Sequence, residues 1–339
     1  MIAIAALIFS GAAPALSVIE PFIPWSVAAL LVLSGTPYLG RLHKYLELTS
    51  HFRVQYFIAA AVGLPICVAL ADWWCAAGAV LSAAVNLSAI APLYLGKRLV
   101  DDGTPRHRLK LALANVDWQN RAHQPFLRCM ERHQPDVIVV QEVNYDWAHA
   151  LQALSATYPF FEVLPREDGS GTALYSRFSF ERLPLALPED DVRPDLLVRL
   201  DLALGKVSLL SIHPRAPIRR GHFELRNEVL AAATTCMQGL PDPKICVGDL
   251  NTSLWSPFYQ DFARQTKLIN ARKGFGLLPS WPTFMGFKWL MIPIDHFLVS
   301  SDIRIVSVRT GERIGSDHLP LLVELEINGP TQGAPKKGY

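Results

Sequence analysis

The sequence predicts an α/β domain of two packed β-sheets with helices outside them, preceded by a bundle of about three transmembrane helices. Two observations lead to this fold class. The first is an abrupt change at Asp101, where charged residues go from rare to as frequent as in an ordinary globular protein. The second is a series of short apolar runs from Leu109 onward, with polar residues at their carboxyl ends and a few helical segments between them. The chain of 339 residues is therefore expected to form two structural units.

The first hundred residues carry five Lys or Arg and three Asp or Glu side chains. Val54–Ala71 and Trp73–Tyr94 are apolar, and each is close to the ~20 residues that a helix needs to cross a hydrocarbon core. Ile2–Ile19 and Phe22–Leu39 are also apolar, and we expect one further span within residues 2–39. The sequence thus predicts a membrane anchor over residues 1–100, an α/β domain over 101–328 and a flexible tail over 329–339.

The basic residues around these stretches predict an orientation. Three of them, Arg41, Lys44 and Arg53, precede the pair of apolar stretches, and Lys97 and Arg98 follow it, whereas the loop at residues 71–72 has neither Lys nor Arg. By the positive-inside rule, both basic flanks lie in the cytoplasm. We expect an integral protein of the inner or plasma membrane whose α/β domain is cytoplasmic.

From Asp101 to the end, the chain holds 27 basic and 27 acidic residues. Proteins that grip long stretches of nucleic acid normally have a basic surplus, because neutralised phosphates supply much of the affinity. Neutrality weakens a duplex-binding hypothesis without excluding it. The five cysteines are irregularly spaced and form no zinc motif, so we expect them to be reduced and buried.

The elements of the second unit follow from its apolar runs. Helices are expected at Arg121–Gln134 and Phe223–Met237. Strands are expected at Leu109–Val116, Val137–Val140, Ala173–Ser176, Leu196–Leu204, Val207–Ile212, Lys244–Val247, Ile294–Val299 and Leu319–Ile327.

Polar residues sit at the ends of these strands or in the turns beside them: Asn115, Glu142, His213, Asp249, Asn251 and His318. Each alone is more simply explained as a turn or capping residue. Because the ends of neighbouring strands converge on one edge of a sheet, the ordered series predicts that they meet in space. Oxygen ligands for a hard cation such as Mg²⁺ are available from Glu142, Asp317 and Asn115. Phosphoryl transfer needs charge neutralisation and in-line positioning, so this inventory favours phosphoester hydrolysis.

The series resembles the endonuclease/exonuclease/phosphatase superfamily, whose fold is that of DNase I. The matching segments cover residues 109–327 in the family's order: LALANVDWQN, DVIVVQEVN, GTALYSR, LLSIHP, KICVGDLNTSLWSPFY, PIDHFLVS and IGSDHLPLLVEL. The resemblance implies a four-layer α/β/β/α sandwich. One departure is Ala114, where the family usually has an aromatic residue before the asparagine, and we expect it to change packing rather than chemistry.

The resemblance also implies roles for individual residues. Glu142 would be the main ligand of Mg²⁺ (or Mn²⁺), with Asn115 and Asp317 nearby and Asp117 as an outer-shell contact. The remaining residues would act on the substrate: Asp249 would orient or deprotonate the attacking water, Asn251 would hold the phosphate or the nucleophile, and His213 would protonate or otherwise stabilise the leaving oxygen. His318, kept charged by Asp295, would bind a phosphoryl oxygen. Independently of the family, a carboxylate beside an imidazole fixes its tautomer and favours its protonated form. His296 follows Asp295 on a strand, so its side chain should point to the opposite face, away from the site.

Three hypotheses for function stay open. A lipid phosphate or small phosphoester as substrate suits the membrane anchor, and aromatic residues between Trp255 and Met291 could form a lipid-facing rim or simply pack in loops. A membrane-tethered nuclease would use the same aromatics to stack on bases, with Arg215, Arg219 and Arg220 as a small positive cluster. A catalytically silent scaffold is disfavoured because every site position holds a competent side chain. The bilayer and the phosphoester are the expected partners, and no obligate protein partner is indicated.

Overall fold

A computed structural model describes residues 18–96, 106–185, 193–203 and 205–328. The chain divides into two compact units, Met1–Ala91 and Pro92–Tyr339, which are described separately. The division lies before the change in composition at Asp101.

The described part of the first unit is helical. Its elements are η1 (Glu20–Phe22), α3 (Ile23–Gly35), η2 (Thr36–Leu39), α4 (Lys44–Leu48), η3 (Thr49–Phe52), α5 (Arg53–Ala69) and α6 (Trp73–Ile90), followed by η4 (Ala91–Leu93). Among the described residues, three helical segments are long and apolar enough to cross a membrane: Glu20–Leu39, Lys44–Ala69 and Trp73–Leu93. Most of the expected stretch Ile2–Ile19 lies outside the described residues.

In the first unit, large apolar side chains are exposed and several polar ones are buried, which is unlike a soluble protein. Large apolar side chains such as Trp25, Val32 and Val62 are exposed, whereas polar side chains are buried between the helices. The Arg53 guanidinium donates to the carbonyl of Ser34 (3.0 Å) and to Oδ1 of Asn86 (3.3 Å), and Nδ2 of Asn86 donates to Oγ of Ser34 (2.8 Å). Apolar exteriors with hydrogen-bonded polar groups between helices are typical of membrane bundles.

The second unit contains two six-stranded sheets. The first has the order β11-β12-β1-β2-β4-β3, and the second has the order β5-β6-β7-β8-β10-β9. The strands are β1 (Arg106–Asn115), β2 (Val137–Gln141), β3 (Phe160–Leu164), β4 (Thr172–Ser176), β5 (Phe180–Arg182), β6 (Leu196–Leu202), β7 (Gly205–Ser211), β8 (Lys244–Asp249), β9 (Ile269–Asn270), β10 (Asp295–Val299), β11 (Ile303–Thr310) and β12 (Leu321–Asn328). In each sheet one central pair is parallel, β1 with β2 and β7 with β8, and the other pairs are antiparallel.

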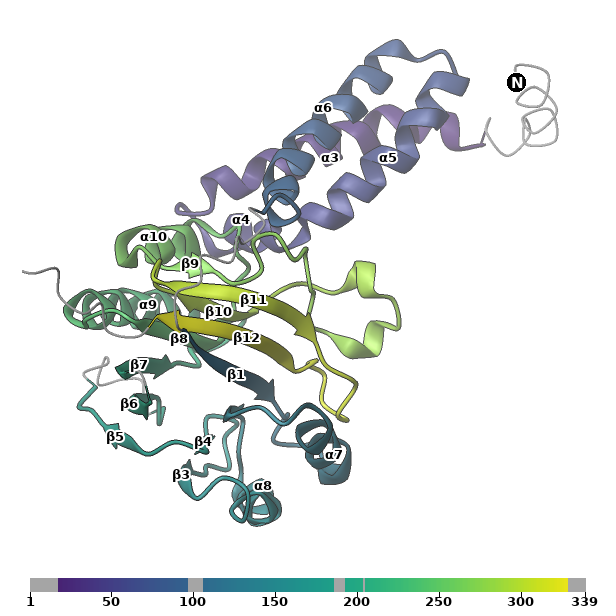
Figure 1. Cartoon of the computed structure of the whole chain (residues 1–339). Coiled ribbons are helices and arrows are strands. Elements are labelled where there is room, and N and C mark those ends of the chain that lie inside the picture. Colours follow the sequence, from purple (N-terminus) through teal and green to yellow (C-terminus); the bar gives the residue numbers. More distant parts are fainter. Residues whose placement is uncertain (1–17, 97–105, 186–192, 204, 329–339) are drawn as a thin grey trace, which may run out of the picture. The chain divides into compact units, whose positions relative to one another are not determined.

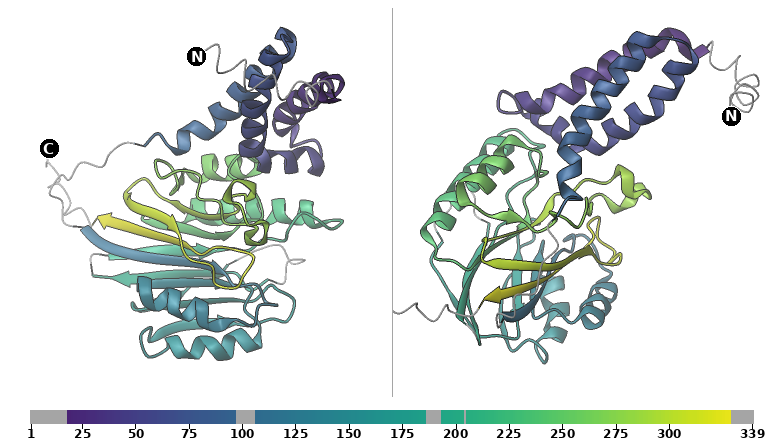
Figure 2. Two further views of the ribbon diagram at one scale, coloured as in Figure 1. Left: turned by 90° about the vertical axis from the view of Figure 1, so that its right-hand side faces the viewer. Right: turned by 45° about the horizontal axis from the view of Figure 1, so that its top comes forward.

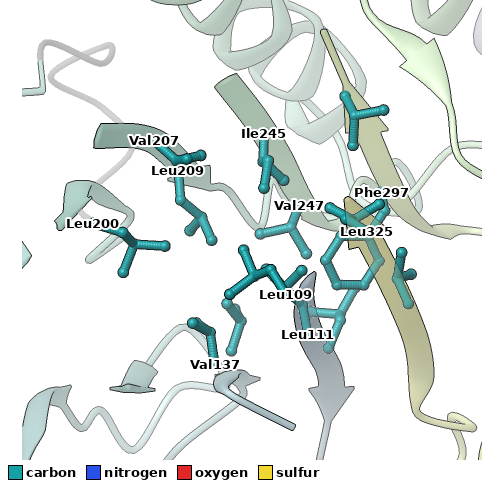
Figure 3. Close-up of a cluster of buried hydrophobic side chains, with 14 of the residues drawn as sticks. Leu109, Leu111, Val137, Leu200, Val207, Leu209, Ile245, Val247, Phe297 and Leu325 are labelled. Carbon is teal, nitrogen blue, oxygen red and sulfur yellow. The ribbon is translucent and has the colours of Figure 1, made fainter. Parts of the chain in front are cut away.

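Apolar side chains from both sheets fill the space between them. Leu109 and Leu111 of β1 meet Val247 of β8 and Phe297 of β10 in one buried cluster (Figure 3). Because side chains alternate along a strand, Ala112 and Ala114 of β1 face the other way, toward the outer helices. Ala114 therefore packs beneath helices and stays out of the polar cluster, as expected from its departure from the family pattern.

Two pairs of helices cover the outer faces of the sheets. Helices α7 (His123–His133) and α8 (Tyr145–Leu151) pack on the first sheet through Phe126, Met130 and Trp147. Helices α9 (His222–Gly239) and α10 (Pro257–Thr266) pack on the second through Leu230 and Phe262, among other residues. Figures 1 and 2 show the pairs on opposite sides of the stacked sheets. The predicted four-layer α/β/β/α sandwich is confirmed.

Each predicted strand and helix of the second unit is present, with ends shifted by a few residues. Strand β8 continues through Gly248 and Asp249, where a turn was expected. Several elements were not predicted: α8, α10, β3, β5, β9 and β11. Strand β3 lies at a sheet edge with no fully buried side chain, and β11 has an irregularity between Ile305 and Ser307 that breaks its alternation, so neither shows a clear strand pattern. All five cysteines are free, and four are buried as expected, whereas Cys236 is only partly buried.

Gly248 of β8 lies directly against Ile212, which follows β7, and against the side chain of Gln141. Its φ is +154°, and a Cβ there would lie 1.9 Å from the carbonyl oxygen of Ile212 and 2.8 Å from Nε2 of Gln141. We expect Gly248→Ala to lower the thermal unfolding midpoint of the detergent-solubilised chain by about 5 °C or more, because the backbone must shift to relieve this clash. Gly239→Ala is the matched control, since nothing lies within 4 Å of its added Cβ. Equal midpoints for the two variants would contradict the prediction.

Candidate active site

The predicted polar residues converge where the two sheets meet at their strand ends. Asn115 ends β1, and its Nδ2 donates to Oε1 of Glu142 (2.9 Å) and to Oδ2 of Asp249 (3.3 Å). The same Nδ2 lies 3.5 Å from Nε2 of His318. The amide of Asn115 thus joins Glu142, which follows β2, Asp249 of β8 and His318 of the loop before β12. Its Oδ1 accepts from the backbone N–H of Asp117 (3.1 Å), so its NH₂ group faces the carboxylates.

Two carboxylates of the second sheet face each other within this cluster. Asp249 of β8 and Asp295 of β10 are direct partners in the antiparallel ladder, and both are buried. His318 lies between them, with Nδ1 at 2.9 Å from Oδ2 of Asp295 and Nε2 at 3.6 Å from Oδ2 of Asp249. The predicted pairing of Asp295 with His318 is confirmed in this geometry.

The charges in this trio are set by burial and by one another. Burial alone would lower the pKa of His318, but the carboxylates of Asp295, Asp249 and Asp317 outweigh it and raise the pKa to about 10. Burial and the neighbouring Asp295 raise the pKa of Asp249 to about 7, although His318 opposes the shift. Burial would also raise the pKa of Asp295, yet the His318 imidazolium holds it below its usual value. His318 is therefore a buried cation, and Asp249 is a carboxylate with raised basicity.

His213 follows β7 and reaches the same cluster from the other side. Its Nε2 lies 3.8 Å from Oδ2 of Asp249 and 3.9 Å from Oε1 of Glu142. Its backbone N–H donates to Oδ1 of Asp195 (2.9 Å), and its carbonyl accepts from the Arg193 guanidinium (2.6 Å). Burial, together with the positive charge of Arg193, lowers the pKa of His213 well below its ordinary value. The imidazole of His213 is therefore neutral.

Three residues of the cluster or its rim adopt left-handed backbone conformations. The φ angles are +64° at Glu142, +48° at Asn251 and +56° at Asp117. Such angles are unfavourable for residues with a Cβ and gather at functional sites, where the surrounding structure holds them. At Glu142 the conformation turns the carboxylate back toward β1, where Oε2 accepts from the backbone N–H of Trp118 (3.3 Å). Burial raises the pKa of this carboxyl group.

Asp317 and Asn251 lie at the edge of the cluster. Asp317 is partly exposed; its Oδ2 accepts from Nε1 of Trp281 (2.8 Å), and its Oδ1 lies 3.9 Å from Nε2 of His318. The side chain of Asn251 donates to the carbonyl of Pro214 (2.9 Å), and its backbone N–H donates to Oδ1 of Asp249 (2.9 Å). Asn251 thus connects Asp249 with the segment that follows His213.

The opposite face of β10 carries His296, as expected from strand alternation. His296 is fully buried; its Nε2 lies 2.8 Å from the carbonyl oxygen of Thr252, and its ring packs on Tyr259 at 4.6 Å. It supports the turn that carries Asn251 but does not face the cluster.

Sequence reasoning missed two residues that hold the cluster together. The side-chain oxygen of Gln141 accepts from the backbone N–H of Asp249 (2.8 Å), and its Nε2 donates to the carbonyl of Ile212 (2.9 Å). Ser316 donates from Oγ to the carbonyl of Asn115 (2.8 Å) and accepts from the backbone N–H of His318 (3.0 Å). Both residues were visible in the quoted motifs, but their partners are backbone groups that no sequence pattern marks.

Comparison with known proteins decides the family. The model of the Endonuclease/Exonuclease/phosphatase family matches residues 112–318, which include every residue of the cluster. This chain belongs to that family. Its members are metal-dependent phosphoester hydrolases, nucleases or phosphatases, and the chain is accordingly a hydrolase of phosphoester bonds. No curated protein sequence matches the chain significantly.

Solved structures of the family share the fold at low identity. An endonuclease/exonuclease/phosphatase from Beutenbergia cavernae is 18% identical with a TM-score of 0.51, over 66% of this chain and 72% of that one. A protein of the family from Bacteroides vulgatus is 17% identical with a TM-score of 0.52, over 66% of this chain and 100% of that one. The 3′ phosphatase NExo from Neisseria is 18% identical with a TM-score of 0.52, over 63% of this chain and 98% of that one.

Enzymes of this family generally use divalent metals, and the charges of the cluster fit such an ion. Glu142, Asp249 and Asp295 bring three carboxylates to one place, whereas His318 supplies one positive charge and His213 supplies none. Burial is the main cause of the raised pKa values of Glu142 and Asp249, and nearby carboxylates, Asp317 at Glu142 and Asp295 at Asp249, raise them further. Oxygen donors with excess negative charge suit a hard cation. Asp249, Asp295 and His318 also offer ligand atoms within 4.8 Å of one another, as a metal site requires. Asp295 and His318, however, are already hydrogen-bonded to each other.

Gln141 gives a test of how the two sheets are held at the site. We expect Gln141→Leu to lower the thermal unfolding midpoint of the solubilised chain, because the buried N–H of Asp249 and the carbonyl of Ile212 each lose a partner at about 1–3 kcal/mol. Hydrolysis of a soluble phosphodiester should fall as well, since Asp249 loses the bond that positions it. Gln152→Leu, at an exposed site, is the control and should change neither quantity. An unchanged unfolding midpoint in Gln141→Leu would contradict the proposal that the Gln141 side chain holds the two sheets together.

Proposed function

We propose that this protein is a membrane-anchored, divalent-metal-dependent hydrolase that cleaves a phosphoester by in-line attack of water. The observation that carries the proposal is the cluster of Glu142, Asn115, Asp249 and His318, which the chain builds from both sheets. It combines carboxylate oxygens, a buried imidazolium and a basic carboxylate within a few ångströms. These are the groups that phosphoryl transfer to water requires.

Each residue has a step that its environment supports. The His318 imidazolium, held by Asp295, binds a non-bridging phosphoryl oxygen and stabilises the charge of the transition state. Asp249 accepts a proton from the attacking water, for which its raised pKa is suited. Asn251 holds the phosphate or the water beside Asp249. His213 is neutral and donates a hydrogen bond from Nε2 to the leaving oxygen.

Mg²⁺ or Mn²⁺ would be held by Glu142, with Asp317 and the Asn115 amide nearby. When bound, the ion neutralises phosphoryl charge and lowers the pKa of the leaving group's oxygen. Asn115 presents its NH₂ group to the carboxylates here, so rotation of the amide would bring its oxygen to the ion. That rotation would break the hydrogen bond from the backbone N–H of Asp117 to Oδ1 of Asn115, and the Asp117 side chain would remain as an outer contact of the ion.

The first unit supports anchoring in a bilayer. Three candidate spans with exposed apolar faces and an internal polar network suit a membrane better than water. Arg41 and Lys44, just before and at the start of the second candidate span, favour the cytoplasmic side for the second unit. We therefore place the protein in the inner or plasma membrane, with its hydrolase unit in the cytoplasm.

A membrane-borne or small phosphoester is the substrate class we favour. Residues 101–339 carry as many acidic as basic side chains, which is not the basic surplus that nucleic-acid binding favours. A nuclease is the second candidate, because Arg219 and Arg220 are exposed on the loop after His213. NExo, solved with a product DNA hairpin, and Danio rerio TDP2, solved with a single-strand DNA product, share the fold at TM-scores of 0.52.

The catalytic assignment is tested by three substitutions. We expect Glu142→Gln, Asp249→Asn and His318→Ala each to reduce Mg²⁺-dependent hydrolysis of a generic phosphodiester by about a hundredfold or more, because each removes a charge needed in the transition state. Chelation should abolish wild-type turnover, and added Mg²⁺ or Mn²⁺ should restore it. Glu181→Gln, an exposed carboxylate of β5, is the control and should keep full activity. Near-wild-type rates in the three variants with intact folding would refute the assignment.

The orientation is tested by reporters fused after Tyr339. We expect green fluorescent protein to fluoresce and alkaline phosphatase to stay inactive, because alkaline phosphatase needs disulfides that form outside the cytoplasm. Fusions after Ala71, in the loop between the second and third candidate spans, should give the reverse pattern. Active alkaline phosphatase after Tyr339 would place the hydrolase unit on the outer side.

A further inference from the structure

A loop beside the active site carries a concentrated group of exposed apolar side chains. The segment from Trp281 to Ile292 is closed by a bridge between these two residues and projects as a light green loop beside β11 and β12 (Figure 1). All residues from 284 to 289 are exposed. The large apolar ones among them are Phe284 (69% exposed), Met285 (46%), Phe287 (61%) and Trp289 (49%). We call residues 284–289 the aromatic tip. Single exposed apolar residues are ordinary, but four within six positions mark an interaction surface.

The base of this loop is bonded to the catalytic residues. Nε1 of Trp281 donates to Oδ2 of Asp317 (2.8 Å), and the backbone N–H of Thr283 donates to the carbonyl of Asp317 (2.9 Å). Oγ1 of Thr283 donates to the carbonyl of Ser316 (2.9 Å), and the Arg313 guanidinium donates to the carbonyl of Thr283 (2.8 Å). Whatever the aromatic tip contacts is therefore held at a fixed distance from Asp317 and His318.

The segment just upstream of the loop binds residues at the end of the third candidate span. Leu93 is the last residue of that span and belongs to the second unit. Its carbonyl accepts from the backbone N–H groups of Gly274 (2.8 Å) and Gly276 (2.9 Å). Gly96 and Gly274 touch through their backbones, since a Cβ on Gly96 would lie 2.6 Å from Cα of Gly274. If Trp73–Leu93 crosses a bilayer, the hydrolase unit begins at the bilayer surface.

Resting on the proposed function, we infer that the aromatic tip inserts into the interfacial layer of the same bilayer, so that the substrate is a phosphoester in a lipid head group. Trp and Phe side chains prefer that layer, and Lys288 within the tip complements anionic head groups. The hydrogen bonds at the base of the loop then bring a head group beside the tip to the metal and His318. The bilayer is the one partner that the chain keeps permanently within reach.

The insertion is tested without reference to activity. The full chain is reconstituted in vesicles of phosphatidylcholine and phosphatidylglycerol, with and without brominated acyl chains. The contribution of Trp289 is taken as the difference between wild type and Trp289→Phe, which removes the signal of the other tryptophans. We expect bromine to quench about half or more of that contribution. A Trp289 signal unaffected by bromine overturns the proposal.

The substrate class is tested with a triple variant, Phe284→Ser with Phe287→Ser and Trp289→Ser. The matched control replaces three exposed apolar residues elsewhere in the unit, Tyr145, Phe160 and Ile218, by Ser. We expect the tip variant to lose about tenfold or more of its activity on phospholipid vesicles while keeping its rate on a soluble phosphodiester. The control should keep both rates.

The outcomes separate this inference from the proposed function. If the wild-type chain cleaves no phosphoester but bromine quenches Trp289, the proposed hydrolase function is wrong and the membrane insertion of the tip is still supported. Cleavage of the soluble diester without cleavage of any lipid overturns the lipid substrate. Equal losses on both substrates would make the tip a part of the site's structure. Loss confined to single-stranded DNA would assign the tip to base stacking in a nuclease.

Discussion

The active site depends on His318 lying between two carboxylates that the fold places face to face. Asp249 and Asp295 are opposite each other in the antiparallel pairing of β8 with β10, and like charges in such positions repel. An imidazolium 2.9 Å from one and 3.6 Å from the other makes the arrangement tolerable in a buried place. His318 is itself held by Ser316, which bonds to the carbonyl of Asn115 at the end of β1. The His318 imidazolium, which offsets the charge of the two carboxylates of the second sheet, therefore lies on a loop that is hydrogen-bonded to the first sheet.

The uncharged side chain of Gln141 makes a second connection between the two sheets at the site, beside the charged one made by His318. An amide can join the backbone N–H of Asp249 to the carbonyl of Ile212 because it offers one acceptor and one donor. A carboxylate in its place would add a further negative charge where there is already an excess. Both neighbours of this connection have left-handed backbones: Glu142 directly follows Gln141, and Asn251 bonds to Asp249, which Gln141 holds. Hydrogen bonds hold both residues in these unfavourable conformations: Glu142 accepts from Asn115 and from the backbone N–H of Trp118, and Asn251 donates to Asp249 and to the carbonyl of Pro214.

Sequence reasoning anticipated the parts of the structure that leave a periodic or chemical pattern. Buried strands such as β1, β2 and β8 are apolar runs with polar ends, and the Asp295–His318 pair was implied by the resemblance of their motifs to the family. The edge strand β3 and the irregular β11 leave no such pattern. Gln141 and Ser316 could not be assigned roles because their partners are backbone atoms distant in sequence. The orientation of the Asn115 amide, with its NH₂ group toward Glu142, depends on a local bond to Asp117 that composition cannot reveal.

The proposed membrane anchor accounts for the absence of a basic surplus in the residues beyond residue 100. An enzyme that collects an anionic substrate from solution gains rate from a positive field, but this unit has as many acidic as basic residues beyond residue 100. Anchoring offers another way to raise the encounter rate, because a tethered site meets ligands of the same bilayer at a high effective concentration. Under that condition a strong positive surface would add little and would attract competing polyanions. The negative excess at Glu142, Asp249 and Asp295 would then act only at short range, where it would favour a divalent cation, and the proposed role of that cation and His318 is to neutralise the phosphate together.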